Sequence, residues 1–472
     1  MQQLSGMDAS FLYFETPKSP GHIFSVYIYD PTTAPGGAVT YKGILDHYRS
    51  RLHVSPVFRR RLVEVPFGLD HPYWIEDEDF DLEYHVRHIA LPKPGDWRQL
   101  CIQLARLHSR PLDMSKPLWE ATVIEGLDNV EGVPPGGFAI IQKIHHAAVD
   151  GVTVLEITSA VHDLEPDTPT FPPEGQWRPE RPPSPVTLLT RATVTNVLRP
   201  GHFARVMART VPATRALQQR VRRGELEAPP TAAPRTRFNA PVTGHRVIEA
   251  RRFDLATVKR IKAAVPGATI NDVAIAIVGG ALRTYLSDKG ELPTESLRVM
   301  VPISVRSQDQ MGTAGNQVAT MTATLGTDID DPLKRLEAVR QSTHASKAFA
   351  EASDARSMVE FSQLMPGGLA TLAARAASRF EMASRGTPPV NCVVSNVPGP
   401  QVPIYFAGAR LVTFFGGAAV VDGMGLLHGI SSYCGELIVS VVSDRALMHD
   451  PAAYAACIQQ SYDDLVAAAA AG

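Results

Sequence analysis

Cysteine is scarce in this sequence, and its scarcity argues against two kinds of architecture. Cys101, Cys392, Cys434 and Cys457 are spread over 472 residues, which is too few for a disulfide scaffold. No two cysteines have the C-x-x-C spacing that nucleates many zinc sites. We therefore expect a reduced, cytoplasmic protein.

A surplus of charge and a long apolar run are missing as well. Lys and Arg number 46 against 48 Asp and Glu, and the net charge of −2 argues against a dedicated nucleic-acid binder. The longest weakly charged stretch, between Arg410 and Glu436, is divided by Asp422 into pieces of 11 and 13 residues. A membrane span needs about 20 apolar residues. The N-terminus also lacks the features of a secretory signal, so we expect any membrane contact to be peripheral.

The composition that remains is typical of more than one folded domain. Hydrophobic residues make up 44% and charged residues 20%, which argues against disorder. Proline-rich stretches at 165–185 and 228–241 predict domains at 1–165 and 242–472 joined by a linker, 166–241. Both parts contain strand and helix patterns, so we predict two α/β domains. The strand patterns cover 138–144, 297–305 and 437–442, and the helical patterns cover 152–164, 271–286 and the chain from 451 onward.

The linker contains an arginine-rich segment. Residues 181–224 include nine arginines and no acidic residue, with apolar residues interleaved. This pattern is typical of basic amphipathic helices on an anionic membrane surface. The alternative is a solvated helical linker whose apolar side packs on the protein. Pro200-Gly201 and Pro212 are expected to break any long helix here.

One local motif carries candidate chemistry: His145-His146-Ala-Ala-Val-Asp150-Gly151. It follows the predicted strand at 138–144, so an imidazole would lie at a rigid but accessible position. Histidine, with a pKa of about 6.5, suits general-base removal of a proton from an alcohol, amine or thiol. A buried core pair and a metal site remain alternatives. A shared metal is disfavoured because neighbouring strand residues point to opposite faces.

Several other chemistries lack their motifs. No G-x-S-x-G elbow is present, and no cysteine lies near these histidines in the sequence. Neither a Walker P-loop nor a G-x-G-x-x-G fingerprint occurs at a strand–helix junction. Nucleophilic, phosphoryl-transfer and nicotinamide chemistry are therefore disfavoured.

The H-H-x-x-x-D-G motif is the signature of the acyl-CoA-dependent acyltransferase superfamily, shared by chloramphenicol acetyltransferase-like enzymes and peptide-synthetase condensation domains. Neighbouring motifs resemble the bacterial wax ester synthase/diacylglycerol acyltransferase family, and especially its actinobacterial, triacylglycerol-forming branch. These motifs lie at 4–14, 111–120, 269–273, 301–306, 315–318, 394–400, 405–410 and 431–433. The resemblance implies two chloramphenicol acetyltransferase-like domains with a tunnel at their interface.

The resemblance also implies a reaction and roles for the motif. His146 would be the general base that deprotonates a diacylglycerol or long-chain alcohol, whose oxygen attacks acyl-CoA directly. Acyl-CoA is then a substrate, and no cofactor is expected. His145, Asp150 and Gly151 would shape the loop, with Asp150 pairing an arginine of 58–61.

Three further groups follow from the resemblance. Asn271 and Asp272 would lie near the tunnel and face His146, and a helix cap is the alternative interpretation of this pair. Two other sets are expected to support the site, the first beneath the catalytic loop and the second as a polar lining: Pro117 with Trp119, and Ser395 with Asn396.

Three functions remain open from the sequence. The first is acyl transfer to diacylglycerol, with wax ester synthesis as a sister activity. The second is acylation of a peptide, polyketide or amine on the same fold. The third is a catalytically weak protein recruited to the inner membrane or to lipid droplets through 181–224.

Overall fold

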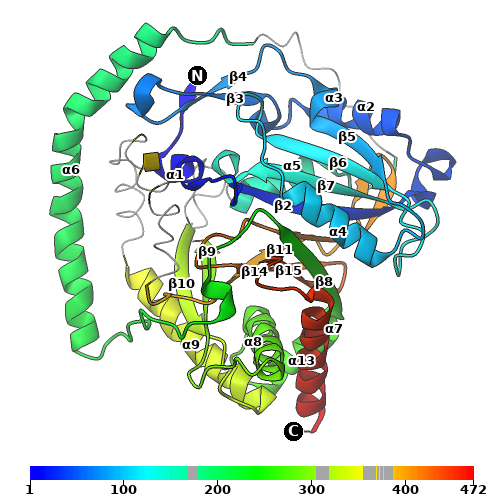
Figure 1. The fold of residues 1–472 in the computed structure, drawn as a ribbon, viewed down its shortest axis with the longest axis vertical. Coiled ribbons are helices and arrows are strands. Elements are labelled where there is room, and N and C mark those ends of the chain that lie inside the picture. The colour runs from blue at the N-terminus through cyan, green and yellow to red at the C-terminus, as the bar shows by residue number, and fades with distance from the viewer. Residues whose placement is uncertain are drawn as a thin grey trace.

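Two six-stranded sheets form the body of the protein (Figure 1). The computed structural model describes residues 1–149, 151–167, 179–304, 318–353 and 386–471, together with positions 368, 371, 372 and 376. In Figure 1 the first sheet, mostly blue to cyan, lies above the second, which is mostly green to red. Strands and helices occur in both halves, which confirms the expected α/β class.

The first sheet has the strand order β12-β13-β2-β7-β6-β5. Its strands are β12 (Tyr405–Phe406), β13 (Ala409–Gly417), β2 (His22–Asp30), β7 (Phe138–His145), β6 (Trp119–Glu125) and β5 (Val86–Ala90). The strand predicted over 138–144 is β7, and all eight of its residues are buried. A strand buried on both faces needs no polar alternation, which explains why its sequence is mostly apolar.

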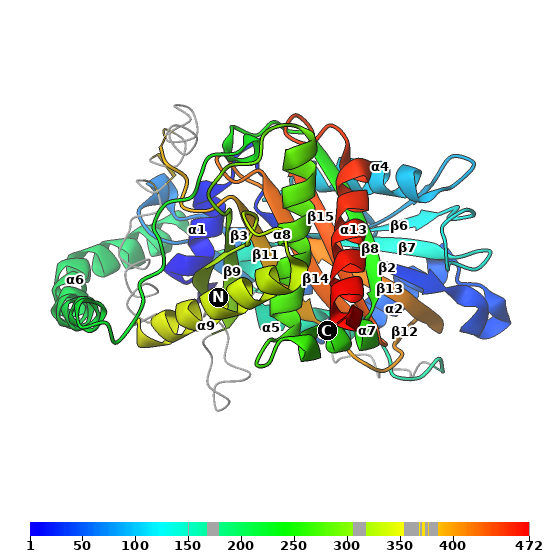
Figure 2. The ribbon, with the colours of Figure 1, turned by 90° about the horizontal axis from the view of Figure 1, so that it is seen from below.

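The second sheet has the order β10-β9-β11-β14-β15-β8, and helices α7, α8, α9 and α13 pack on its outer face, as Figure 2 shows. Its strands are β10 (Val318–Thr324), β9 (Arg298–Ser304), β11 (Cys392–Pro398), β14 (Leu426–Tyr433), β15 (Glu436–Asp444) and β8 (Arg246–Asp254). The helices are α7 (Leu255–Ala264), α8 (Ile270–Asp288), α9 (Pro332–Ala352) and α13 (Pro451–Ala471). The strand and helix predictions in this half are therefore confirmed.

Strand β13 joins the two sheets. It comes late in the chain, yet it pairs antiparallel with β2 of the first sheet. On its other side, the Ser440 hydroxyl of β15 donates to the carbonyl of Gly416, at 2.5 Å. The backbones are close: a Cβ at Gly416 would lie 2.5 Å from the carbonyl oxygen of Phe24, so only glycine fits there.

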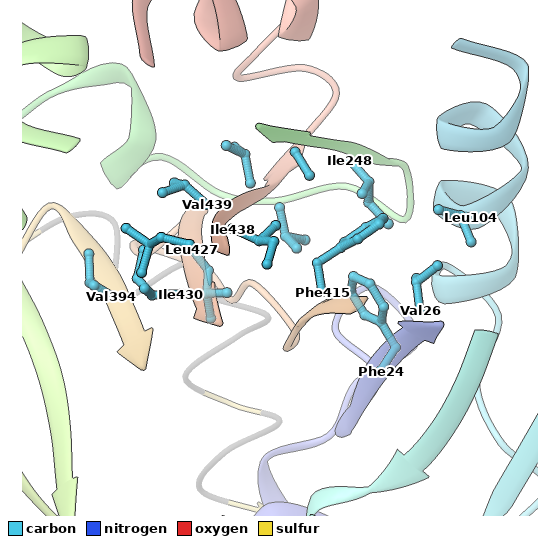
Figure 3. Packing of buried hydrophobic residues seen from close by; sticks show 14 of the residues in the cluster. Phe24, Val26, Leu104, Ile248, Val394, Phe415, Leu427, Ile430, Ile438 and Val439 are labelled. Atoms are coloured by element: carbon cyan, nitrogen blue, oxygen red, sulfur yellow. The ribbon is translucent and has the colours of Figure 1, made fainter. Parts of the chain in front are cut away.

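One continuous hydrophobic core runs through both halves. Figure 3 shows Phe415 of β13 between Phe24 on β2 and Ile248 and Ile438 of the second sheet. The halves are thus fused by apolar packing as well as by β13.

Smaller elements surround the first sheet. A three-stranded sheet has the order β1-β4-β3. The elements are β1 (Gln2–Gln3), β3 (Arg60–Val63), β4 (Tyr73–Glu76), α1 (Gly6–Phe14), α2 (Tyr41–Arg51), α3 (Leu82–His85), α4 (Trp97–His108) and α5 (Gly151–Val161).

The arginine-rich segment forms one helix, α6 (Pro185–Arg222), which stands at the side of the body (Figure 1). The expectation that Pro200-Gly201 and Pro212 would break it was wrong. A proline removes one backbone donor and bends a helix, but the remaining hydrogen bonds let the helix continue. Figure 1 shows the bend. Among the described residues, no helix is long and apolar enough to cross a membrane.

Candidate active site

The two histidines of the motif lie at the end of β7. His145 is the last residue of the strand, and His146 begins a single 3-10 turn, η5 (His146–Ala148). Two backbone hydrogen bonds fix this exit: the His145 N–H donates to the carbonyl of Leu118, and the His146 N–H donates to that of Gly21, each at 2.9 Å. The strand end thus places two consecutive imidazoles in different surroundings.

His145 is completely buried, and hydrogen bonds orient its ring. Its Nδ1 accepts from the backbone N–H of Ala147 at 3.0 Å, and its Nε2 lies 3.3 Å from Oε2 of Glu15. Because Nδ1 accepts, the ring hydrogen is assigned to Nε2, which donates to Glu15. The side chain of His145 therefore links the end of β7 to the following turn and to Glu15.

His146 is only half-buried, and its ring lies flat against Phe11 of α1. The ring centroids are 3.8 Å apart and the planes differ by 10°. Glu15 directly follows α1, so one helix end contacts both histidines. The sequence did not single out Phe11 or Glu15 as site residues. The resemblance of 4–14 to a family motif includes Phe11 but ends one residue before Glu15.

The rest of the motif is described in part. Gly151 is the first residue of α5. Asp150, and with it the expected pairing with an arginine of 58–61, lies outside the described residues. Two of these arginines have other partners: Arg60 donates to the side chain of Gln2 at 3.0 Å, and Arg61 pairs with Asp77 at 3.1 Å.

Pro117 and Trp119 lie beside the strand end that carries His145. Both are buried, and the Trp119 indole N–H donates to the carbonyl of Phe58 at 2.9 Å. The carbonyl of Leu118, between them, accepts the His145 N–H. The segment therefore anchors the strand end through its backbone and its buried indole.

Asp272 caps α8. Its Oδ2 accepts from both the N–H and the hydroxyl of Thr269 at 2.7 Å, and its Oδ1 accepts from the Thr343 hydroxyl at 2.6 Å. The Asp272 N–H donates back to the Thr269 hydroxyl, which completes a capping box. The cap interpretation of the pair is confirmed for Asp272, as the capping-box partner of Thr269.

Asn271 contacts the other predicted polar pair. Asn396 of β11 donates from Nδ2 to Oδ1 of Asn271, at 3.3 Å. Ser395, the preceding residue of β11, pairs in register with Gly429 of β14. The described hydrogen bonds thus hold the candidate residues in two groups, one on β6 and β7 and one on α8 and β11.

Buried polar side chains lie around the end of β7 that carries His145. His22, opposite His145 in the sheet, contacts His108 at 3.1 Å between ring nitrogens. Burial lowers the pKa of His108 to about 3 and that of His22 well below its usual value, so both rings are neutral. Burial also lowers the pKa of Lys143, against the opposing effect of Glu120 at 3.2 Å. Over the described part of the chain, no group of three His, Cys, Asp or Glu side chains could hold a metal ion.

Two family models match the chain. Residues 4–274 match the wax ester synthase/diacylglycerol acyltransferase catalytic domain, and residues 314–466 match the C-terminal domain of the same family. A Mycobacterium tuberculosis protein, provisionally named a diacylglycerol O-acyltransferase, is 33% identical over all of this chain and 98% of its own length. Another protein of that species with the same provisional name is 35% identical over 94% of each chain.

Solved structures share the fold. The wax ester synthase/diacylglycerol acyltransferase of Marinobacter aquaeolei VT8 superposes with a TM-score of 0.68 at 24% identity, covering 99% of this chain and all of that one. A starter condensation domain of rhizomide synthetase, solved with C8-CoA and Leu-SNAC, has a TM-score of 0.55 at 13% identity and covers 99% of this chain and 94% of its own. At these identities the likeness concerns the fold alone.

Proposed function

The chain belongs to the wax ester synthase/diacylglycerol acyltransferase family, and from this premise we propose that it transfers a long-chain acyl group from acyl-CoA to diacylglycerol. The provisional names of the mycobacterial relatives support diacylglycerol as the acceptor. The product is triacylglycerol, and long-chain alcohols are the alternative acceptors. The enzyme works at the cytoplasmic side of an inner membrane or at a lipid-droplet surface.

One observation carries the assignment of the base: His146 is half-buried beside a fully buried His145. Both nitrogens of His145 are already engaged, by Ala147 and Glu15, so that ring is part of the scaffold. The ring of His146 is held in place by Phe11 and retains exposed surface. A general base needs both a fixed position and access to the substrate.

The reaction in this proposal has two steps. A nitrogen of His146 takes the hydroxyl proton of diacylglycerol while the hydroxyl oxygen attacks the thioester carbonyl carbon. The tetrahedral intermediate then expels the coenzyme A sulfur, and the imidazolium returns its proton to that sulfur. The carbon–oxygen ester bond replaces the carbon–sulfur bond, and His146 ends neutral. Asn271, Ser395 and Asn396 line the substrate path from the second half in this proposal, supported by the hydrogen bond between the two asparagines.

The test is a competition assay with a matched control. Purified protein receives palmitoyl-CoA with equimolar diacylglycerol and hexadecanol, and the lipid products are separated. We expect triacylglycerol as the main product and a loss of at least about a hundredfold in rate for His146→Ala. His449→Ala, at an exposed histidine, should retain the wild-type rate. If wax ester were the main product, long-chain alcohol would be the preferred acceptor. An unchanged rate in His146→Ala would refute the assignment of His146 as the general base.

A further inference from the structure

The first half of α6 is attached to the body along one side. Leu188 and Ala192 are buried against Val65 and Tyr73. Four residues further on, Asn196 donates from Nδ2 to the carbonyl of Leu69 at 3.0 Å. This attached side fits the prediction of a linker helix whose apolar residues pack on the protein.

The opposite side of the same turns is apolar and exposed. Val186, Val194 and Val197 have exposed fractions of 72%, 56% and 73%, and Leu198 has 65%. At 3.6 residues per turn, the three valines lie roughly opposite Leu188 and Ala192, and Leu198 lies beside them. Packing on the protein therefore explains one side of the helix and leaves this outward side in water.

The charges of this segment all have one sign. Residues 181–224 contain nine arginines and no acidic residue. Arg205, Arg209 and Arg215, in the turns that follow the exposed valines, are themselves exposed. Such a helix attracts an anionic surface while its aliphatic residues enter the lipid.

A second exposed apolar side chain lies beside α6. Phe67, in the turn η4 (Pro66–Gly68), is 88% exposed, and its φ of 60° is unusual for a bulky residue. The turn contacts α6, and Arg199 of the helix pairs with the buried Asp70 at 2.9 Å, three residues after Phe67. Helix and turn thus form one edge of the molecule.

We infer that this edge is a docking face for an anionic lipid bilayer. The docking face consists of Val186, Val194, Val197 and Leu198 on α6, with Phe67 exposed beside the helix and Arg205, Arg209 and Arg215 supplying the charge. Exposed aliphatic and aromatic residues combined with a single sign of charge favour a bilayer over a second copy of this nearly neutral chain. The inference deepens the proposed function, because diacylglycerol resides in bilayers and the enzyme must reach it there.

The test measures vesicle binding without acyl-CoA, so it does not depend on turnover. We would sediment the full chain with vesicles of phosphatidylcholine and phosphatidylglycerol, and with pure phosphatidylcholine. The triple variant Arg205→Glu, Arg209→Glu, Arg215→Glu should bind the anionic vesicles at least about tenfold more weakly. A variant with the same charge change at three exposed lysines, Lys42→Glu, Lys259→Glu, Lys334→Glu, should lose at most about twofold.

Separate variants test the apolar residues of the docking face. Val194→Asp with Val197→Asp should also weaken binding at least about tenfold, whereas Val402→Asp, 52% exposed, should not. Circular dichroism verifies folding, and light scattering follows the oligomeric state. If all variants sedimented equally with the vesicles, the docking face would be refuted. It would also be refuted if the variants changed the oligomeric state of the protein but not its binding to vesicles.

Two measurements separate this inference from the proposed reaction. His146→Ala should bind vesicles like the wild type, because His146 is not part of the docking face. The charge variant should retain its rate on detergent-dispersed diacylglycerol and lose at least about fivefold on diacylglycerol in anionic vesicles. If acyl transfer is absent in the wild type but vesicle binding persists, the reaction is refuted and the docking face stands.

Discussion

Buried histidines make the fold sensitive to mild acid. Burial lowers the pKa of His47, His108 and His428 to about 3 and that of His162 to about 4. Each ring also has a hydrogen bond in the neutral state, as between His428 Nε2 and the Tyr454 hydroxyl at 2.8 Å. In the unfolded chain the same rings take up a proton near pH 6.5. Acid therefore favours the unfolded state.

The direction and the magnitude of the change in unfolding free energy follow from these pKa values. A histidine with a lowered folded pKa contributes its full stability above about pH 6.5 and loses it as the pH falls towards the folded value. Between pH 7.5 and pH 5.5 the unfolded state gains nearly one proton per ring, and the folded state gains almost none. The loss is about 1.4 kcal/mol for each histidine, and about 5 kcal/mol for the four together.

Urea unfolding at pH 7.5, 6.5 and 5.5, followed by circular dichroism, measures this loss. His428→Gln should reduce the loss by about 1.4 kcal/mol, because one titrating ring is gone. His449→Gln, at an exposed site, should leave it unchanged. A decrease below about 1 kcal/mol in the wild type would refute the reasoning, since it would mean that the buried rings take up protons without unfolding.

Three substitutions test other contacts. Glu15→Ala leaves the Nε2–H of His145 buried without its acceptor, so we expect a loss of about 1–3 kcal/mol in urea unfolding and a lower kcat at unchanged KM, with Glu15→Gln restoring most of both. Gly21→Ala places a Cβ 2.6 Å from the same nitrogen and should cost about 1–3 kcal/mol. Asp163→Asn breaks the buried two-pronged pair with Arg51, at 2.7 and 2.8 Å, and should cost about 3–5 kcal/mol.

Two of these substitutions, Gly21→Ala and Asp163→Asn, have a counterpart at an exposed position. Gly201→Ala has open space around the new methyl group and should be neutral or stabilising. Asp46→Asn breaks an exposed pair with Arg49 and should change the free energy of unfolding by less than about 1 kcal/mol. If the buried and the exposed variants changed the free energy of unfolding equally, burial would not determine the cost of these substitutions. Wild-type kinetics in Glu15→Ala would show that His146 does not depend on the His145 contact.

Local patterns in the sequence predicted much of the fold. The buried strand β7, the helix α8 and the placement of His145 and His146 at a strand end follow from runs of apolar residues and their endings. The capping role of Asp272 follows from its position at the start of the predicted helix. These features depend on residues close together in the chain, where hydrophobic periodicity and capping rules apply.

Long-range packing could not be predicted in the same way. Glu15 reaches His145 across 130 positions, and no periodicity links the two residues. The continuity of α6 through Pro200 depended on how a helix accommodates a proline, which the sequence leaves undecided between a bend and an end. The pairing of β13 with the first sheet likewise depends on the meeting of both halves.

The pairing of β13 with β2 can form only late in the synthesis of the chain. β2 is complete at residue 30 and acquires β7 by residue 145, but its other neighbour, β13, begins only at residue 409. At roughly 5–20 residues per second, the ribosome leaves this edge of β2 without its strand for on the order of 10–50 s. An open strand edge pairs readily with other chains. The first half is therefore vulnerable to aggregation during synthesis, and a chain stopped before residue 409 keeps that edge open permanently.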